Sequence, residues 1–474
     1  MTRYTAILFL ILCLFVGPTL AGSYYGVWRW PMLFFLAIFL IAGAKICLNK
    51  KGLAGFQIKV LFVTTISLCF QGLWMLFNRK FTFFENEVHQ GVHKVWQLEP
   101  NLDQVAPSLP GGIDFYQAVD RLSSILPSLL ALFFIAVLVR RNKLSPKVII
   151  ITIFWTGVLV ALLGITQRFM GAKGTFWSDT FNFDGRNLFF GTYRSPGIAC
   201  CYLNLCLALG LSYLLVTTRK ALQLRKRSPV PSLCISLGVL IICSGSILAG
   251  SKAGLVFTFL TIIIWSVWNF SSVWKTLMNS TSLLPDNNPR ERNFIIGTCG
   301  IIFVVTLLAV AGTVMNRWDA SIESDYQTLQ YRGLINQVQY EMISDPDWGA
   351  YGFGAGSFAI LFPFYKNEVP GLERANTFYS HNDHLQMLVE WGWFGTSCFY
   401  LILIGGILLL LRNIISKRKS KRGKSDTIYS KGIVVAFIII SLHAFVDFPY
   451  QIESIAFTIC CLLGIAWGQK HVRT

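Results

Sequence analysis

Titratable side chains are concentrated in the segment 380–395, which reads Ser-His-Asn-Asp-His-Leu-Gln-Met-Leu-Val-Glu-Trp-Gly-Trp-Phe-Gly. Histidine exchanges a proton near neutral pH, so His381 is a candidate catalytic general base. We expect Asp383 and Glu390 to orient the groups around it. A helix start with Ser380 as its N-cap would also account for Asp383, but it explains neither His381 nor Glu390.

A metal centre is the main alternative for the histidines of this segment. His381 and His384 are spaced i,i+3 and could share an ion, but the sequence offers no evident third ligand. The pair Asp345-x-Asp347 imitates the metal-binding acids of sugar-nucleotide glycosyltransferases, although a proline-containing turn explains the same residues. We therefore predict neither a metal site nor a cofactor.

A glycine-rich run, Gly-Phe-Gly-Ala-Gly-Ser-Phe, occupies residues 352–358. Closely spaced glycines can bring backbone N–H groups around a phosphate. They also permit a tight turn with positive φ angles, which is the simpler interpretation. Both alternatives remain open at the level of the sequence.

Three cations, Arg194, Lys252 and Arg332, are expected at the same membrane face as His381. A cation at that depth is costly without an anionic partner, and diphosphate or lipid headgroups are the available anions. Extension of each side chain towards the lipid surface would explain any one of them alone. Their common placement makes all three candidate diphosphate ligands.

Long apolar blocks must position these residues. The chain of 474 residues is 54% hydrophobic and only 14% charged, which is typical of a membrane protein. Blocks long enough to cross a bilayer predict an all-α polytopic membrane protein with about twelve spans. They are 4–21, 30–48, 57–77, 122–139, 147–167, 195–217, 231–249, 253–270, 293–315, 384–411, 431–448 and 452–469.

The charged residues sort the connecting loops into two sets. One set, which includes both termini, carries 27 Lys plus Arg and 3 acidic residues, whereas the rest of the chain carries 14 and 20. Because basic loops stay in the cytoplasm, we predict that both termini are cytoplasmic. The outer loops 78–121, 168–194 and 316–383 are long, and the last, between spans 9 and 10, is expected to be partly helical. The charge pattern therefore gives no reason to expect a nucleic-acid partner.

Two local features of the span pattern have alternatives. Residues 250–252 are so short a connection that the spans on either side predict a tight helical hairpin. The first span follows Arg3 and ends in Thr-Leu-Ala-Gly, so it could be a signal peptide. We favour a retained helix because the second span follows closely.

Several of these motifs occur in an order that resembles the O-antigen ligase and polymerase family of bacterial inner-membrane proteins. The resemblance covers 245–395 and includes Ala-Gly-Ser-Lys-Ala-Gly at 249–254, Arg332, the glycine run and the His-Asn-x-x-Leu-Gln-x-x-x-Glu-x-Gly run from His381. Outlying pieces are Gly-Thr-Tyr-Arg-Ser-Pro at 191–196 and His-Ala-Phe-Val-Asp-Phe-Pro at 443–449.

The chain departs from the family pattern at two positions. Lys252 stands where the family usually has arginine, which keeps the charge but loses the bidentate fork. Gly197 stands where asparagine is often found. His443 and Asp447 are spaced i,i+4, so a packing hydrogen bond on one helix face is the alternative to a supporting role in the site.

The resemblance implies transfer of a glycan from an undecaprenyl-diphosphate carrier to an acceptor hydroxyl at the periplasmic face. The acceptor would be a glycan, the lipid A core or a protein hydroxyl, and membrane lipid would surround the enzyme. The expected organisation is 1–190 for the first five spans, 191–411 for the ligase-like core and 412–474 for a basic loop with two final spans. A transporter of a small solute such as bicarbonate is the competing class, but the mid-membrane segments hold few charges.

Overall fold

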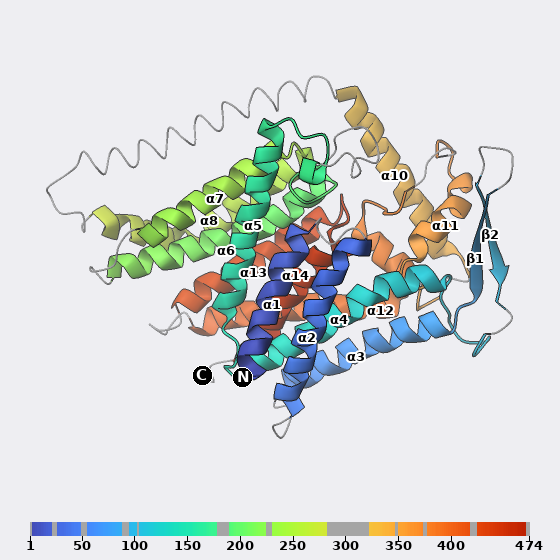
Figure 1. Ribbon diagram of the computed structural model, residues 1–474, viewed down its shortest axis with the longest axis horizontal. Helices are drawn as coiled ribbons and strands as arrows, with labels where there is room; N and C mark the ends of the chain where they lie inside the picture. Colours follow the sequence, from blue (N-terminus) through green and yellow to red (C-terminus); the bar gives the residue numbers. More distant parts are fainter. Residues whose placement is uncertain are drawn as a thin grey trace.

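The computed structural model describes residues 2–20, 26–48, 55–87, 94–101, 104–177, 189–223, 230–281, 322–346, 349–372, 377–417 and 424–470. Within these ranges the chain is predominantly helical (Figure 1). The helices are α1 (Thr2–Thr19), α2 (Gly26–Leu48), α3 (Phe56–Phe77), α4 (Phe115–Arg140), α5 (Pro146–Phe169), α6 (Pro196–Gln223), α7 (Val230–Leu248), α8 (Lys252–Thr281), α10 (Ile322–Ser344), α11 (Ser357–Tyr365), α12 (Asp383–Lys417), α13 (Lys424–His443) and α14 (Glu453–Gly468).

Ten of these helices are long and apolar enough to cross a membrane, so the chain is a multi-pass membrane protein. They coincide with ten of the twelve predicted spans. The predicted span 452–469 is the helix α14, which is shorter at 16 residues. The predicted span 293–315 lies outside the described residues, and the predicted hairpin at 250–252 is present as the turn between α7 and α8.

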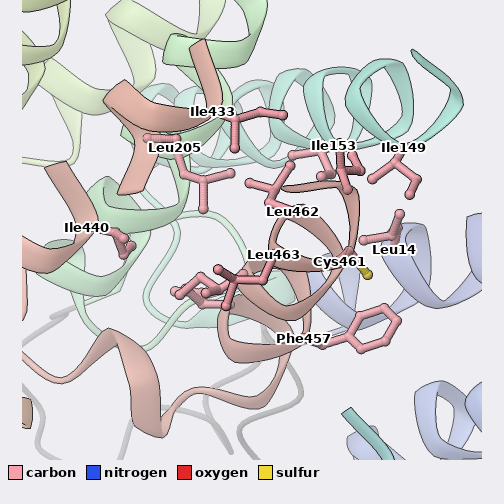
Figure 2. Packing of buried hydrophobic residues seen from close by; sticks show 14 of the residues in the cluster. Leu14, Ile149, Ile153, Leu205, Ile433, Ile440, Phe457, Cys461, Leu462 and Leu463 are labelled. Carbon is pink, nitrogen blue, oxygen red and sulfur yellow. The ribbon is translucent and has the colours of Figure 1, made fainter. Parts of the chain in front are cut away.

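The helix α14 occupies the centre of the bundle. Its side chains Phe457, Cys461 and Leu462 are almost completely buried. Figure 2 shows them among apolar residues contributed by α1, α5, α6 and α13. The helix α14 is thus enclosed by other helices of the bundle, which fixes the position of the loop that precedes it.

One end of the bundle gathers segments that were predicted to be cytoplasmic. Arg3 Nε donates a hydrogen bond to the carbonyl of Lys143, 2.7 Å away, and Arg141 donates to the carbonyl of Ile46 at 3.2 Å. These contacts join the beginning of α1, the α4–α5 turn and the end of α2. These three segments therefore lie at one end of the bundle, as the charge pattern predicted, while their orientation across the membrane remains a prediction.

The candidate spans are all helical, as predicted, but the loop between α3 and α4 contains two strands that the sequence did not indicate. β1 (Phe81–Glu87) and β2 (Lys94–Pro100) pair antiparallel, with Phe81 opposite Pro100 and Glu87 opposite Lys94. Figure 1 shows this hairpin at the end of the molecule that also carries α10 and α11.

The long segment between α8 and α12 is partly helical, as predicted, and has a core of its own. Ile335, Val338 and Met342 of α10 pack with Phe358 and Phe362 of α11 in an apolar cluster separate from the main one. The segment is therefore an ordered cap on the bundle within the described ranges 322–346 and 349–372.

The helix α12 is broken at Gly392, which the sequence does not indicate. Gly392 has φ 61° and ψ −169°, so the backbone leaves the helical conformation there. The N–H of Phe394 donates to the carbonyl of Ala350, and the side-chain amide of Gln71 donates to the carbonyl of Trp391 at 2.8 Å. Backbone groups freed by the break thus have partners inside the protein, which a membrane environment requires.

Candidate functional site

The predicted catalytic histidine, His381, lies immediately before α12. The helix begins at Asp383, and the side chain of Asn382 accepts a hydrogen bond from the N–H of Leu385. Asn382 is therefore the N-cap, and the prediction of Ser380 in that role is wrong. The hydroxyl of Ser380 instead bonds within a turn with Asn382, accepting from its N–H at 3.0 Å and donating to its carbonyl at 2.8 Å.

His381 lies in that turn with a backbone conformation unusual for its type. Its φ is 56°, in the left-handed region that non-glycine residues seldom occupy. Its side chain is 29% exposed, and its Nδ1 lies 3.4 Å from Oδ1 of Asp447. The surrounding contacts thus hold the imidazole in a fixed place, at the cost of backbone strain.

Asp383 joins the beginning of α12 to the α13–α14 loop. Its N–H donates to the carbonyl of Ala444 at 2.9 Å, and its Oδ2 accepts from the N–H of Tyr450 at 2.5 Å. These two bonds clamp the loop that carries Asp447 against the turn that carries His381. The carboxyl of Asp383 is completely buried, so it is a structural tie between the two segments.

The i,i+4 relationship of His443 and Asp447 was predicted to lie on one helix face, but α13 ends at His443. The N–H of Asp447 still donates to the carbonyl of His443 at 3.0 Å. Neither ring nitrogen of His443 has a hydrogen-bond partner among the described residues, and its ring lies 4.5 Å from that of Phe257. The packing hydrogen bond between the two side chains is therefore not formed.

Arg332 of α10 lies beside the same loop. Its guanidinium donates to the carbonyl of Val446 at 2.8 Å. Burial alone would raise the pKa of the Asp447 carboxyl, but His381, His443 and Arg332 together lower that pKa below its ordinary value. Asp447 is therefore a buried carboxylate that carries its negative charge at neutral pH.

Glu390, predicted to support the site, is buried at the contact between α12 and α11. It is 3% exposed and accepts a hydrogen bond from Gln386 at 3.0 Å. Its carboxylate also accepts from the N–H groups of Gly356 and Phe358, at the beginning of α11. An acid at this position favours the helix N-terminus, so Glu390 fastens α11 to α12.

The glycine run forms a tight turn. Gly352, Gly354 and Gly356 all have positive φ, and the N–H of Gly354 donates to the carbonyl of Glu390 at 2.9 Å. The N–H of Phe353 likewise donates to the carbonyl of Val389. These backbone donors are engaged within the protein, so the turn interpretation is confirmed over the phosphate cradle.

The metal alternative finds no support within the described part of the chain, where no group of three His, Cys, Asp or Glu side chains could hold an ion. His384 Nε2 lies 2.9 Å from the carbonyl of Ser441, and its Nδ1 contacts the hydroxyl of Tyr400. Asp345 accepts the hydroxyl of Tyr365, while Asp347 lies outside the described residues.

Residues close in sequence to Lys252 and Arg194 contact His443 and Asp447. Lys252 is the first residue of α8, and Phe257 in the next turn contacts His443. Arg194 precedes α6, where a Cβ on Gly197 would lie 2.1 Å from Oδ2 of Asp447. The beginnings of α6 and α8 thus border the Asp447 loop.

The sequence did not single out an aromatic wall and the arginine behind it. The rings of Tyr379 and Phe448 stack with centroids 4.3 Å apart, and Phe448 meets His381 edge-on at 5.0 Å. Arg121 of α4 lies over Tyr379 at 4.9 Å and donates to the carbonyl of Gln451 at 3.3 Å. The sequence offered one indication of Arg121: it is a basic residue directly before the fourth predicted span, where a cation needs a partner.

A family model matches the segment of the chain that carries Lys252, Arg332 and His381. No curated protein matches the chain. Residues 237–400, which contain α8, Arg332, the glycine run and the first half of α12, match the model of the O-antigen ligase family.

Proposed function

We propose that this protein transfers a glycan from an undecaprenyl-diphosphate carrier to an acceptor hydroxyl at the periplasmic face of the bacterial inner membrane, with both termini in the cytoplasm. The observation that carries the proposal is the pairing of His381 with Asp447 beside Arg332. Two of these three residues belong to the domain that matches the O-antigen ligase family.

The proton acceptor in this reaction is His381. Asp447 faces Nδ1 and stabilises the imidazolium form, which leaves Nε2 to take the proton of the acceptor hydroxyl. The acceptor oxygen forms a bond to the anomeric carbon while the bond from that carbon to the phosphate oxygen breaks. The electron pair of the broken bond leaves with the diphosphate, and the proton passes from His381 to solvent.

The leaving diphosphate requires fixed positive charge. Arg332 supplies one guanidinium close to the histidine, and Arg194 and Lys252 supply two further cations from the beginnings of α6 and α8. Donors fixed before the reaction stabilise developing charge better than mobile groups do. This mechanism needs neither a nucleotide sugar nor a metal ion.

The acceptor class distinguishes three versions of the reaction: ligation to the lipid A core, polymerisation of repeat units, and attachment to a protein hydroxyl. The residues shared by these versions are those that handle the donor. The small-solute transporter is the alternative from another class. The charges described above gather at one end of the bundle rather than along its middle, which favours the transferase.

The test is transfer in lipid nanodiscs, with a labelled undecaprenyl-diphosphate glycan and separate acceptors, in the presence and absence of a chelator. We expect the wild-type protein to form labelled product in both conditions and His381→Ala to form none. Solute uptake by proteoliposomes that survives His381→Ala, without glycan transfer by the wild type, would overturn the proposal. Transfer that stops on chelation would overturn its metal-free mechanism.

A further inference from the structure

A cavity of about 380 Å³ opens at the end of the bundle opposite the histidine site. Four separate segments of the chain line it: the beginning of α1, the α4–α5 turn, the beginning of α13 and the residues after α14. Its charged lining residues are Arg3, Lys147, Lys470 and Asp426. Three cations against one acid make the cavity attractive to an anion.

The architecture of the cavity adds to that attraction. Pro146 and Lys147 are the first two residues of α5, and the side chain of Ser145 at the N-cap makes no capping hydrogen bond. A helix N-terminus carries partial positive charge. The hydrogen bond from Arg3 to the carbonyl of Lys143 fixes the arginine beside this turn. The cations and the helix end therefore surround one space instead of being scattered over a surface.

The floor of the cavity is apolar. Val139, Ile150, Ile433 and Ile465 line it, and each is at most 7% exposed in the folded protein. A polar mouth above an apolar floor, at the end of membrane-spanning helices, suits a ligand that is anionic at one end and situated at the membrane surface. Anionic phospholipids have this character, and basic pockets between helices are known to hold their headgroups.

We propose that this cavity binds the phosphate of an anionic phospholipid headgroup, and that the bound lipid joins the two ends of the chain to α5 and α13. The site is independent of the proposed glycan transfer and of the residues assigned to it. Arg3 and Lys470 both line the cavity, although they belong to segments far apart in sequence. A bound headgroup that contacts both would hold the beginning of α1 and the end of α14 together.

The test compares lipid retention by native mass spectrometry after delipidation and addition of phosphatidylglycerol or phosphatidylethanolamine. The variant Arg3→Gln/Lys147→Gln/Lys470→Gln removes the three cations. Its matched control is Lys45→Gln/Lys59→Gln/Arg412→Gln, which removes the same charge from exposed positions at the same end of the bundle and outside the cavity. A second variant, Arg3→Lys/Lys147→Arg/Lys470→Arg, keeps the charge and guards against misfolding.

We expect the wild type, the matched control and the charge-conserving variant to retain phosphatidylglycerol over phosphatidylethanolamine. The cavity variant should lose about tenfold of that retention, and its thermal stability should no longer respond to phosphatidylglycerol. Equal retention by the cavity variant and its control would overturn the proposal. Thermal stabilisation by inorganic phosphate without any preference for phosphatidylglycerol would overturn the lipid as the source of the phosphate.

Discussion

Nδ1 of His381 lies 3.4 Å from Oδ1 of Asp447, although one residue precedes α12 and the other lies in the loop between α13 and α14. Two hydrogen bonds of Asp383 hold the loop in place: its N–H donates to the carbonyl of Ala444, and its carboxylate accepts from the N–H of Tyr450. A base that is oriented by a carboxylate, with both fixed by other segments, is the arrangement that general-base catalysis requires.

Replacing the base and its partner should have different effects on transfer. We expect His381→Ala to lower kcat by about 10²-fold or more, because no other proton acceptor replaces it. Asp447→Asn keeps the shape but loses the charge that stabilises the imidazolium, so its loss in kcat should be smaller. Single-turnover assays of both variants measure this, and a loss for Asp447→Asn as large as that for His381→Ala would contradict the assignment of Asp447 as the partner of the base.

The charge on Asp447 predicts a pH dependence of stability. Its pKa is lowered in the folded protein by His381, His443 and Arg332, against the opposing effect of burial. The ionised carboxyl therefore stabilises the fold above its unfolded pKa of about 3.9, and this stabilisation is lost as the pH falls through the lowered folded value. Thermal unfolding in detergent should show Asp447→Asn less stable than wild type at pH 7 and at pH 5.

Below about pH 4 the difference between the two proteins should shrink, because the Asp447 carboxyl takes up a proton first in the unfolded chain and, at lower pH, in the folded protein as well. A difference in unfolding temperature that stays constant from pH 7 to pH 3 would show that the substitution acts through packing instead of charge.

Arg332 is expected to contribute charge and position together. Its bond to the carbonyl of Val446 steadies the Asp447 loop, and its cation is proposed to stabilise the leaving diphosphate. Arg332→Lys keeps the charge but loses the fork geometry, so we expect a loss of about tenfold in kcat/KM, and Arg332→Ala should lose about 10²-fold. Glu341→Gln, an exposed position on the same helix, is the control and should transfer normally.

Arg121 is predicted to be a positioning residue for His381. It holds Tyr379, which stacks on Phe448, which in turn contacts the histidine ring. Arg121→Ala should lower kcat several-fold with little change in donor KM, and Arg121→Lys should restore part of the loss. A rise in KM alone would contradict positioning and indicate direct donor contact.

Much of the fold could be predicted from the sequence, because apolar runs long enough to cross a bilayer are visible in it directly. Ten predicted spans are present as candidate spans, and the cap between α8 and α12 is helical where the sequence suggested it. The strands β1 and β2 were missed because two short strands have little apolar periodicity. The break at Gly392 was missed because its partners, Ala350 and Gln71, are distant in sequence.

The candidate site was partly predictable for the same reason. His381 and Arg332 stand out because titratable groups are rare in an apolar chain. The contact between His381 and Asp447 depends on tertiary structure, and the sequence supplied the residues without the pairing. Glu390 was expected to orient the site; its bond from Gln386 lies within the motif, whereas its backbone partners at the beginning of α11 are not visible in any motif.

The break in α12 gives a stability prediction. A Cβ on Gly392 would lie 2.3 Å from the carbonyl oxygen of Ala350 and 2.4 Å from the nitrogen of Gly352, and its φ is positive. Gly392→Ala should therefore cost more than about 2 kcal/mol and loosen the cap. Gly333→Ala, on α10 with nothing within 4 Å of the new methyl group, is the control and should be neutral or slightly stabilising. Limited proteolysis and thermal unfolding measure both.

Gly197 has no side chain at a position where the family that the chain resembles often has asparagine. A Cβ at this position would lie 2.1 Å from Oδ2 of Asp447, so the carboxylate occupies the space that a side chain would need. Gly197→Ala and Gly197→Asn should both displace Asp447 from His381 and lower kcat by about tenfold.

The effect of the Asp447 carboxylate on kcat can be separated from the effect of a larger side chain at residue 197. If Gly197→Ala acts by displacing the Asp447 carboxylate, it should cause little further loss in kcat in a protein that already carries Asp447→Asn. This holds where the charge of Asp447 matters more for kcat than its shape. Residues in contact are expected to be non-additive in a double-mutant cycle. Additive losses in kcat would mean that Gly197 acts on the acceptor or donor directly, and not through the Asp447 carboxylate.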